Sequence, residues 1–258
     1  MATLSRIHHV GIVVRSLEQA YAFWRDAVGL TVHKEATVKD QGVRAALLPC
    51  GETEIELLEP IDPEGGVAKF LAKRGEGLHH LCFETDDVAQ ALTAAKAKGL
   101  PMIDETPRPG LAGMIGFLHP KASCGVLVEY ATPPPGAAAG QAGEIAFDHL
   151  ALIVDDVPEA IAAFSRNFDL RAGTTSGAPV RLPVGQSAIL MFAASAAPAA
   201  LAGIRGLAAI GLRMRSGGAL LDRITAAAKS HLGASEKSLE YGTTAHGVPL
   251  ALRVASRT

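Results

Sequence analysis

Cysteine is scarce in this 258-residue sequence, and long runs of like charge are missing. The three cysteines, Cys50, Cys82 and Cys124, show no CxxC spacing, which argues against a disulfide framework and against a thiolate zinc site. The formal net charge is only −2, so neither nucleic acid nor an anionic membrane surface is expected as a partner. These absences leave small, non-polyanionic ligands open.

Long hydrophobic runs are missing as well. The N-terminus MATLSRIHH contains no apolar segment of signal-peptide length, and the alanine-rich stretch 193–214 is interrupted by Pro198, Gly203 and Arg205. We therefore expect neither secretion nor a membrane span, and the cysteine usage fits a reducing cytoplasm. A hydrophobic content of 48% is sufficient for one large core or two ordinary ones.

An internal repeat organises the chain. Residues 7–30, IHHVGIVVRSLEQAYAFWRDAVGL, align without a gap with residues 147–170, FDHLALIVDDVPEAIAAFSRNFDL, and this places His9 on His149. Each copy starts with a strand-like run and continues into an amphipathic helix that begins at a capping residue. The pattern returns at 78–100 and, more faintly, at 207–233, and the predicted helix caps are Ser16, Asp87 and Asp156.

Short strands follow each predicted helix, so the unit is β-α followed by a few β-strands. The stretch PPPGAAAGQAGE, residues 133–144, is rich in proline and glycine and has no apolar period, which is typical of a linker. We therefore predict an α+β protein with two domains of two units each, at 1–132 and 145–258.

Histidines and glutamates recur at related places in the first two units. His9 aligns with His80, while Glu56 and Glu129 each lie in a strand that otherwise reads as buried. A single strand histidine is more often a core or surface residue, and Glu56 alone could lie on a solvated strand face, but the two pairs together favour a ligand set.

If the two units face each other, His9, Glu56, His80 and Glu129 surround one point. Two imidazoles and two carboxylates suit Mn, Co, Ni, Fe or Zn, with positions left open for substrate oxygens. Because successive strand residues point to opposite faces, at most one of His79 and His80 is expected to face this point. We expect it to be His80, with His79 in packing or behind the ligands.

Several stretches of the first half resemble one enzyme family, namely IHHVGIVVRSLEQAYAFW, IELLEP, KFLAKRGEGLHHLCFETDD and above all GFLHPKASCGVLVEY. Through them residues 5–132 are similar to the methylmalonyl-CoA epimerase family of the vicinal oxygen chelate superfamily, which also contains glyoxalase I and extradiol dioxygenases. The resemblance implies two paired βαβββ modules that form a cup, and hence four modules in the two tandem domains. It also implies a divalent ion, Co, Mn, Ni or Zn, held by His9, Glu56, His80 and Glu129.

The resemblance also implies catalytic and substrate-binding residues. The family's base is a Glu directly before a QGV-like triplet, and KDQGV places Asp40 there, one methylene shorter; the alternative is a plain turn residue. Glu129, as a displaceable ligand, is a weaker candidate for the second acid/base group. His119, Lys121 and Ser123 in LHPKAS are candidates to bind the substrate carboxylate or thioester tail, although Lys121 could equally be a solvated lysine.

The second half keeps only part of this pattern. His149 is present, Gln186 stands where the counterpart of Glu56 is expected, Ala209 replaces His80, and the closing strand HGVPLALRV has no carboxylate. We predict a degenerate vicinal oxygen chelate domain without a complete metal site, which forms an intrachain pseudo-dimer with the first half; a homodimer of the chain stays open. A pocket for another ligand is the less favoured interpretation.

The predicted function is metal-dependent epimerisation by α-proton abstraction from a methylmalonyl-CoA-like thioester. One alternative is a glyoxalase-like lyase acting on another α-carbonyl substrate. A second is extradiol cleavage with Fe(II) on His9, His80 and Glu129, which leaves Glu56 without a role. The third is a non-catalytic small-molecule-binding protein of the same fold.

Overall fold

The computed structural model describes residues 4–136, 143–173, 179–216, 218–232 and 241–254. Within these ranges no helix combines the length and the hydropathy that a membrane crossing requires. The predicted linker 133–144 lies partly outside the described residues. Mixed helices and sheets confirm the predicted α+β class.

The first half forms an eight-stranded sheet with the order β2-β3-β4-β1-β5-β8-β7-β6. Its strands are β1 (Leu4–Val13), β2 (Lys34–Val38), β3 (Val43–Cys50), β4 (Thr53–Pro60), β5 (Gly77–Thr85), β6 (Arg108–Gly110), β7 (Gly113–Leu118) and β8 (Leu127–Thr132). Two β-α-β-β-β series therefore join along the central antiparallel pair of β1 and β5.

The helices of this half begin where the sequence places their caps. Ser16 and Asp87 each accept a hydrogen bond from the backbone N–H three residues on, at the start of α1 (Leu17–Tyr21) and α3 (Val88–Ala97). A π-helical turn, Ala22–Ala27, continues α1. A further helix, α2 (Gly66–Arg74), is inserted between the two series.

The second half forms a six-stranded sheet with the order β10-β11-β9-β12-β14-β13. Its elements are β9 (Ile145–Val154), α4 (Val157–Phe168), β10 (Val180–Val184), β11 (Ser187–Ala193), β12 (Gly206–Met214), α5 (Ala219–Leu232), β13 (Thr243–Ala245) and β14 (Val248–Val254). Asp156 caps α4 as predicted. Each described series here has one strand fewer than those of the first half, so the count of four βαβββ modules stays a prediction.

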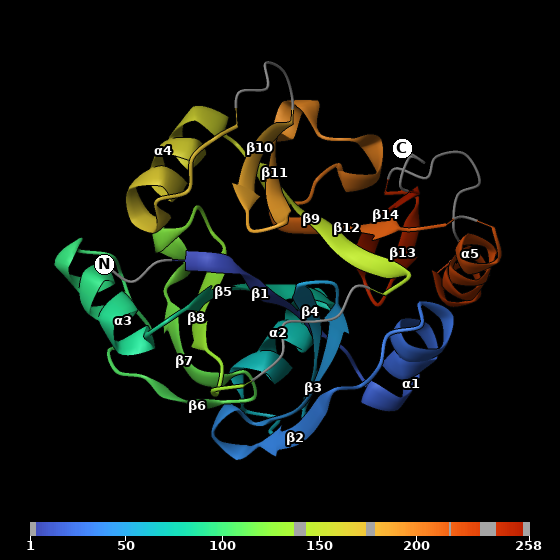
Figure 1. Cartoon of the computed structure of the whole chain (residues 1–258), viewed down its shortest axis with the longest axis horizontal. Helices are drawn as coiled ribbons and strands as arrows, with labels where there is room; N and C mark the ends of the chain where they lie inside the picture. The colour runs from blue at the N-terminus through green and yellow to red at the C-terminus, as the bar shows by residue number, and fades with distance from the viewer. Residues whose placement is uncertain (1–3, 137–142, 174–178, 217, 233–240, 255–258) are drawn as a thin grey trace.

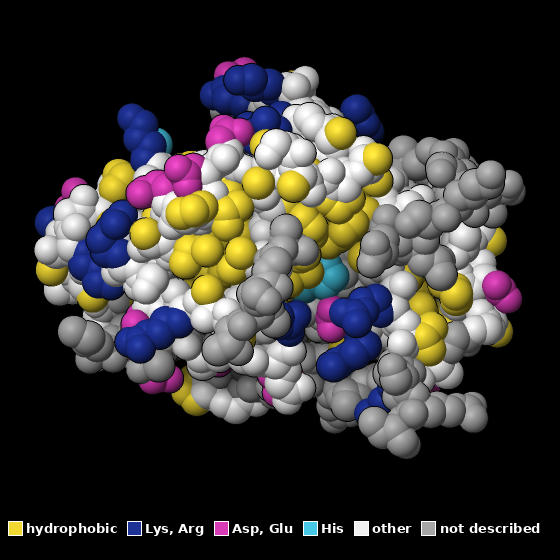
Figure 2. All heavy atoms as spheres, turned by 90° about the horizontal axis from the view of Figure 1, so that it is seen from above, with side chains coloured by type: hydrophobic (Ala, Val, Ile, Leu, Met, Phe, Trp, Pro, Cys, Tyr) yellow, Lys and Arg dark blue, Asp and Glu magenta, His cyan; other side chains and the backbone are white. Residues whose placement is uncertain are grey.

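The two sheets pack against each other through a shared core (Figure 1). Apolar side chains from β1 and β5 meet those from β9 and β12, including Ile7, Phe83, Phe147 and Leu212. This arrangement buries one face of each sheet. Figure 2, seen from the side of the second sheet, shows hydrophobic side chains at the centre of its other face, with a histidine among them and lysine or arginine beside it.

The other face of the first sheet curves around α2 (Figure 1). We call this face the cup; it carries Val13, Leu58, Cys82 and Phe117, which lie in two apolar clusters separate from the shared core. Helix α2 packs against one of these clusters through partly buried apolar side chains. The cup is therefore a shielded, apolar surface in which any polar group needs a partner.

Candidate metal centre

The central strands bring the four predicted ligands to one point. The Nε2 atoms of His9 on β1 and His80 on β5 are 3.0 Å apart, and the Oε2 atom of Glu129 on β8 is 3.1 Å from each. Glu56 on β4 places its Oε2 atom 3.5 Å from His9 Nε2 and 3.3 Å from His80 Nε2. All four side chains are buried.

Strand pairing explains this convergence. β4, β1, β5 and β8 are consecutive neighbours in the sheet, and their register sets Gly11 opposite both Glu56 and His80. Gly11 has no side chain, and a Cβ built there would overlap the His80 imidazole, so the ring lies directly over this residue. The absence of a side chain at Gly11 thus makes room for His80.

The electrostatics of the cluster are those of a cation site. Burial alone would lower the pKa of His80, but hydrogen bonds and charge from Glu129 and Glu56 outweigh it and raise this pKa to about 9. Burial would raise the pKa of Glu129, whereas the charge of His9 and hydrogen bonds from His80 and His9 lower it. The protonated His80 imidazole therefore balances negative charge on the buried carboxylates in the metal-free protein.

The donor set also fits a divalent ion. His9, Glu56 and His80 each offer one atom, and these atoms lie within 4.8 Å of one another. Imidazole nitrogens and carboxylate oxygens are common ligands of Zn, Mn, Co and Ni.

The two histidine doublets, in contrast, do not follow the alternation expected of a strand. The register between β1 and β5 shifts at His8 and again at His79, which makes each an extra residue in a β-bulge. As a result both imidazoles of each doublet meet: the Nδ1 atoms of His8 and His9 are 2.9 Å apart, and those of His79 and His80 are 3.0 Å apart. The bulge breaks the period of two, so both members of a doublet lie on one face, but of His79 and His80 only His80 reaches the other ligands. His79 contacts His80 and Phe70, which agrees with its expected place in packing behind the ligands.

The outer histidine of each doublet can fix the tautomer of the inner one. Burial, followed by the charge of the neighbouring imidazole, lowers the pKa of His8 and of His79 to about 3, so both are neutral. With Nε2 of His9 and His80 turned to the cluster, their Nδ1–H groups donate to the Nδ1 atoms of His8 and His79. Once the inner imidazole has lost its extra proton, this arrangement directs an unprotonated Nε2 toward the candidate metal position.

Further residues support the doublets, and the sequence analysis missed them. Glu54 lies 3.9 Å from His8 and is 3.2 Å from Nδ1 of the half-exposed His33. His79 packs edge-on against Phe70 of α2, with ring centroids 4.9 Å apart. The sequence did carry a signal for the outer histidines, because the whole doublet, and not one histidine alone, recurs in both units.

The other predicted site residues lie on turns. Asp40 is exposed in the 3-10 turn Lys39–Gln41, and His119 accepts a hydrogen bond from the backbone N–H of Lys121, which is itself exposed. Ser123 is buried, and its hydroxyl donates to the Val126 carbonyl at 2.6 Å. Among the described residues no hydrogen bond or ion pair joins them to the histidine–glutamate cluster, so their roles stay predictions.

The second half has a different arrangement around His149. Its Nε2 atom is 2.8 Å from the Tyr241 hydroxyl, and its Nδ1 atom is 2.9 Å from Asp148. His149 pairs with Ala188 as His9 pairs with Glu54, so the counterpart of Glu56 is Leu190. In the parts of this half that the structure describes, no group of three His, Cys, Asp or Glu side chains could hold a metal ion.

The interpretation of Gln186 as the counterpart of Glu56 is therefore wrong. By the same register Gln186 corresponds to Glu52, in the turn before the strand, and its amide donates to the Glu52 carboxylate at 2.7 Å. The error arose because only a strand register, and not a similar side chain, identifies the equivalent residue.

Comparisons with known proteins assign the chain to a superfamily. The sequence model of the glyoxalase/bleomycin resistance protein/dioxygenase superfamily matches residues 8–118. The protein YqjC of Bacillus subtilis, of uncharacterised function, is 36% identical over 131 residues, which are 50% of this chain and 94% of that protein. The chain belongs to this superfamily. Human mitochondrial methylmalonyl-CoA epimerase is 37% identical over 128 residues, 49% of this chain and 73% of that protein.

Solved structures of methylmalonyl-CoA epimerases also match about half of this chain. A methylmalonyl-CoA epimerase in complex with methylmalonyl-CoA and NH4+ is 37% identical with a TM-score of 0.50, covering 54% of this chain and all of that one. The Mycobacterium tuberculosis methylmalonyl-CoA epimerase is 36% identical with the same TM-score, covering 54% of this chain and 95% of that one. These superfamily members thus correspond to about half of the chain.

Proposed function

We propose that the first half, residues 1–132, is a metal-dependent epimerase domain that abstracts the α-proton of a methylmalonyl-CoA-like thioester. The convergence of His9, Glu56, His80 and Glu129 on one buried point carries the proposal, and the similarity to methylmalonyl-CoA epimerases supports it. These residues would hold Co, Mn, Ni or Zn. When bound, such an ion supplies a Lewis acid that stabilises negative charge on substrate oxygens.

The proton steps belong to the chain's own residues. Asp40 takes the α-proton, the C–H electron pair passes into the thioester as an enolate, and a proton returned to the opposite face inverts the centre. Glu129, beside both inner histidines, is the candidate for the second group. The exposed Lys121 suits the substrate carboxylate, with His119 and Ser123 in the same loop as further binding residues.

We further propose that residues 145–258 form a degenerate domain of the same superfamily, joined by the linker 133–144, and take the place of a second subunit. The separate second sheet and the core that it shares with β1 and β5 support this pseudo-dimer. A cytoplasmic location stays a prediction from cysteine usage.

The function is tested by hydrogen exchange at the α-carbon. We expect Co- or Mn-loaded protein to incorporate deuterium from D₂O into methylmalonyl-CoA, as followed by NMR, and His80→Ala to abolish the incorporation. His149→Ala, which removes the corresponding histidine of the second half, is the matched control and should retain it. Absence of exchange by the loaded wild-type protein would show the epimerase proposal to be wrong, and turnover of another α-carbonyl compound would then favour a glyoxalase-like lyase.

The pKa of His80 gives a second expectation, for metal binding itself. In the metal-free protein this pKa is about 9, so the imidazole is protonated at neutral pH and must lose its proton to become a ligand. Apparent affinity for Co or Zn should therefore rise about tenfold per pH unit from pH 7 towards 9 and then level off. Calorimetry at pH 7.5 in two buffers of different ionisation enthalpy should detect roughly one released proton per ion; no release would contradict the assignment of His80.

A further inference from the structure

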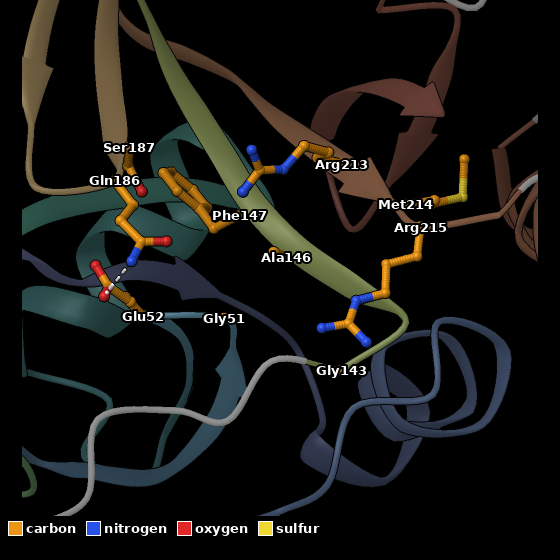
Figure 3. Close-up of a pocket in the computed structure, with 10 residues that line it drawn as sticks. All are labelled: Gly51, Glu52, Gly143, Ala146, Phe147, Gln186, Ser187, Arg213, Met214 and Arg215. Atoms are coloured by element: carbon orange, nitrogen blue, oxygen red, sulfur yellow. Dashed lines mark hydrogen bonds between the residues drawn. The ribbon is translucent and has the colours of Figure 1, made fainter. Parts of the chain in front are cut away.

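A cavity of about 440 Å³ lies where the two halves meet, away from the histidine–glutamate cluster (Figure 3). Its walls come from the β3–β4 turn, the start of β9, the β10–β11 turn and the end of β12. The volume lies within the range of small-molecule sites. The residues that bear on its chemistry are Gly51, Glu52, Ala146, Gln186, Arg213 and Arg215.

The two halves make the same contact twice, and the cavity lies at one of the two copies. The pairing of β1 with β4 and of β9 with β11 makes the turn residues Gly51 and Gly185 equivalent. The gap-free sequence alignment likewise makes Arg6 equivalent to Ala146. A Cβ on Gly185 would lie 3.0 Å from Arg6 Cβ, and one on Gly51 would lie 2.8 Å from Ala146 Cβ.

In the first copy a charged pair occupies the corresponding position. Arg6 donates from Nε to Glu84 at 2.9 Å, from Nη2 to the same carboxylate at 2.6 Å, and from Nη1 to the Glu52 carbonyl. In the second copy Ala146 has only a methyl group in place of the arginine side chain. The strand register places Arg213 where Glu84 stands, because His149 pairs with Gly211 as His9 pairs with Cys82.

The charge of this region is therefore inverted between the copies. Arg213 and Arg215 stand at the positions of Glu84 and Asp86, and the uncharged Ala146 stands at the position of Arg6. Within the described ranges the guanidinium groups of Arg213 and Arg215 form no ion pair and no hydrogen bond, and Figure 3 shows both extending from the end of β12 on the side opposite Glu52. Two guanidinium groups that line one cavity and have no partner among the described residues favour an anion as its ligand.

The carboxylates near the cavity bind groups other than Arg213 and Arg215. The Glu52 carboxylate accepts the Gln186 amide at 2.7 Å, and that of Glu144 accepts the Ser216 hydroxyl at 3.1 Å. Asp148 is 2.9 Å from His149 and 3.7 Å from Arg253, which stands opposite Arg213 on β14.

We propose that the cavity binds a small organic anion whose phosphate or carboxylate group lies between Arg213 and Arg215. Ala146 and Gly51 provide the space, and Phe147 and Met214 provide an apolar wall for the rest of the ligand. The inference is independent of the epimerase proposal, because it uses none of the cluster residues.

The test introduces the arginine–glutamate pair of the first copy into the second copy. Metal-free full-length protein is titrated by calorimetry with inorganic phosphate and, separately, with malonate at constant ionic strength. The double variant Ala146→Arg/Arg213→Glu rebuilds the Arg6–Glu84 pair inside the cavity. We expect saturable binding of at least one anion by the wild type and at least about tenfold weaker binding by the double variant. The anion bound more tightly identifies the ligand's acidic group as phosphate or carboxylate.

Controls separate this site from general surface charge. Arg205→Gln removes an exposed arginine that pairs with Asp155 outside the cavity, and binding should not change. If the double variant fails to fold, Arg213→Gln alone should weaken binding to a similar extent. No saturable binding of either anion, or equal binding by the wild type and the folded variants, would overturn the proposal.

Discussion

Replacing Gly11 with alanine is expected to weaken metal binding severely while the chain stays folded. The new Cβ would overlap the His80 imidazole. β1 is paired on both sides, with β4 and β5, so its backbone cannot move aside. The ring must therefore turn away from Glu129 and Glu56. Displacing a metal ligand lowers affinity more than removing a residue that hydrogen-bonds to that ligand, so we expect affinity for Co or Zn to fall by on the order of 100-fold or more. The overpacking should cost about 1–3 kcal/mol of stability.

Titration with Co(II), followed by its visible absorption, measures this loss directly, and thermal unfolding confirms that the variant is folded. Two glycines provide matched controls. A Cβ on Gly66 at the start of α2 meets nothing within 4 Å, so Gly66→Ala should leave the metal site unchanged. Gly211→Ala places the same clash on His149 in the second half and should also leave metal affinity unchanged. Wild-type affinity in Gly11→Ala would show that His80 is not held as a ligand over this residue.

The cluster could be predicted from sequence because two rules act together. A repeated unit places equivalent residues at equivalent positions, and a carboxylate in an apolar strand needs a cation or a strong donor. Those rules predict that His9, Glu56, His80 and Glu129 lie together, and the structure places all four within contact distance.

What the sequence could not provide was register. The β-bulges that turn His8 and His79 toward the same face as their neighbours depend on how β1 and β5 pair, which residue spacing does not reveal. Gln186 was misassigned for the same reason, since a glutamine in the expected neighbourhood resembled a ligand until strand pairing aligned it with Glu52. The cavity between the two halves could not be predicted from the sequence either, because the difference between Arg6 and Ala146 matters only where each residue lies against a turn of the other half.

Replacing Asp40 with asparagine is expected to lower the rate of α-proton exchange by roughly 10²–10⁴-fold while metal affinity stays at the wild-type value. Asparagine keeps the size of the side chain but cannot accept the proton. The turn itself should survive, because its backbone is held from elsewhere: the N–H of Gly42 donates to the Lys39 carbonyl at 3.0 Å, and the Gly42 carbonyl accepts from Ile61 at 2.8 Å. The comparison of exchange with Co(II) titration therefore separates proton transfer from metal binding.

Asp40→Glu tests whether reach limits the reaction. The family's longer carboxylate would bring the base one methylene closer to a substrate in the cup, so we expect faster exchange than in the wild type, again at unchanged metal affinity. The wild type and the two variants should also differ in their pH–rate profiles, since the limb that reports ionisation of the base should disappear only in the asparagine variant.

If Asp40→Asn exchanges at the wild-type rate, the base is another group, and Asp40 is then a turn residue beside Gly42. In that case Glu129 is the next carboxylate to test, and because it lies 3.1 Å from both inner histidines, its loss should weaken metal affinity and exchange together.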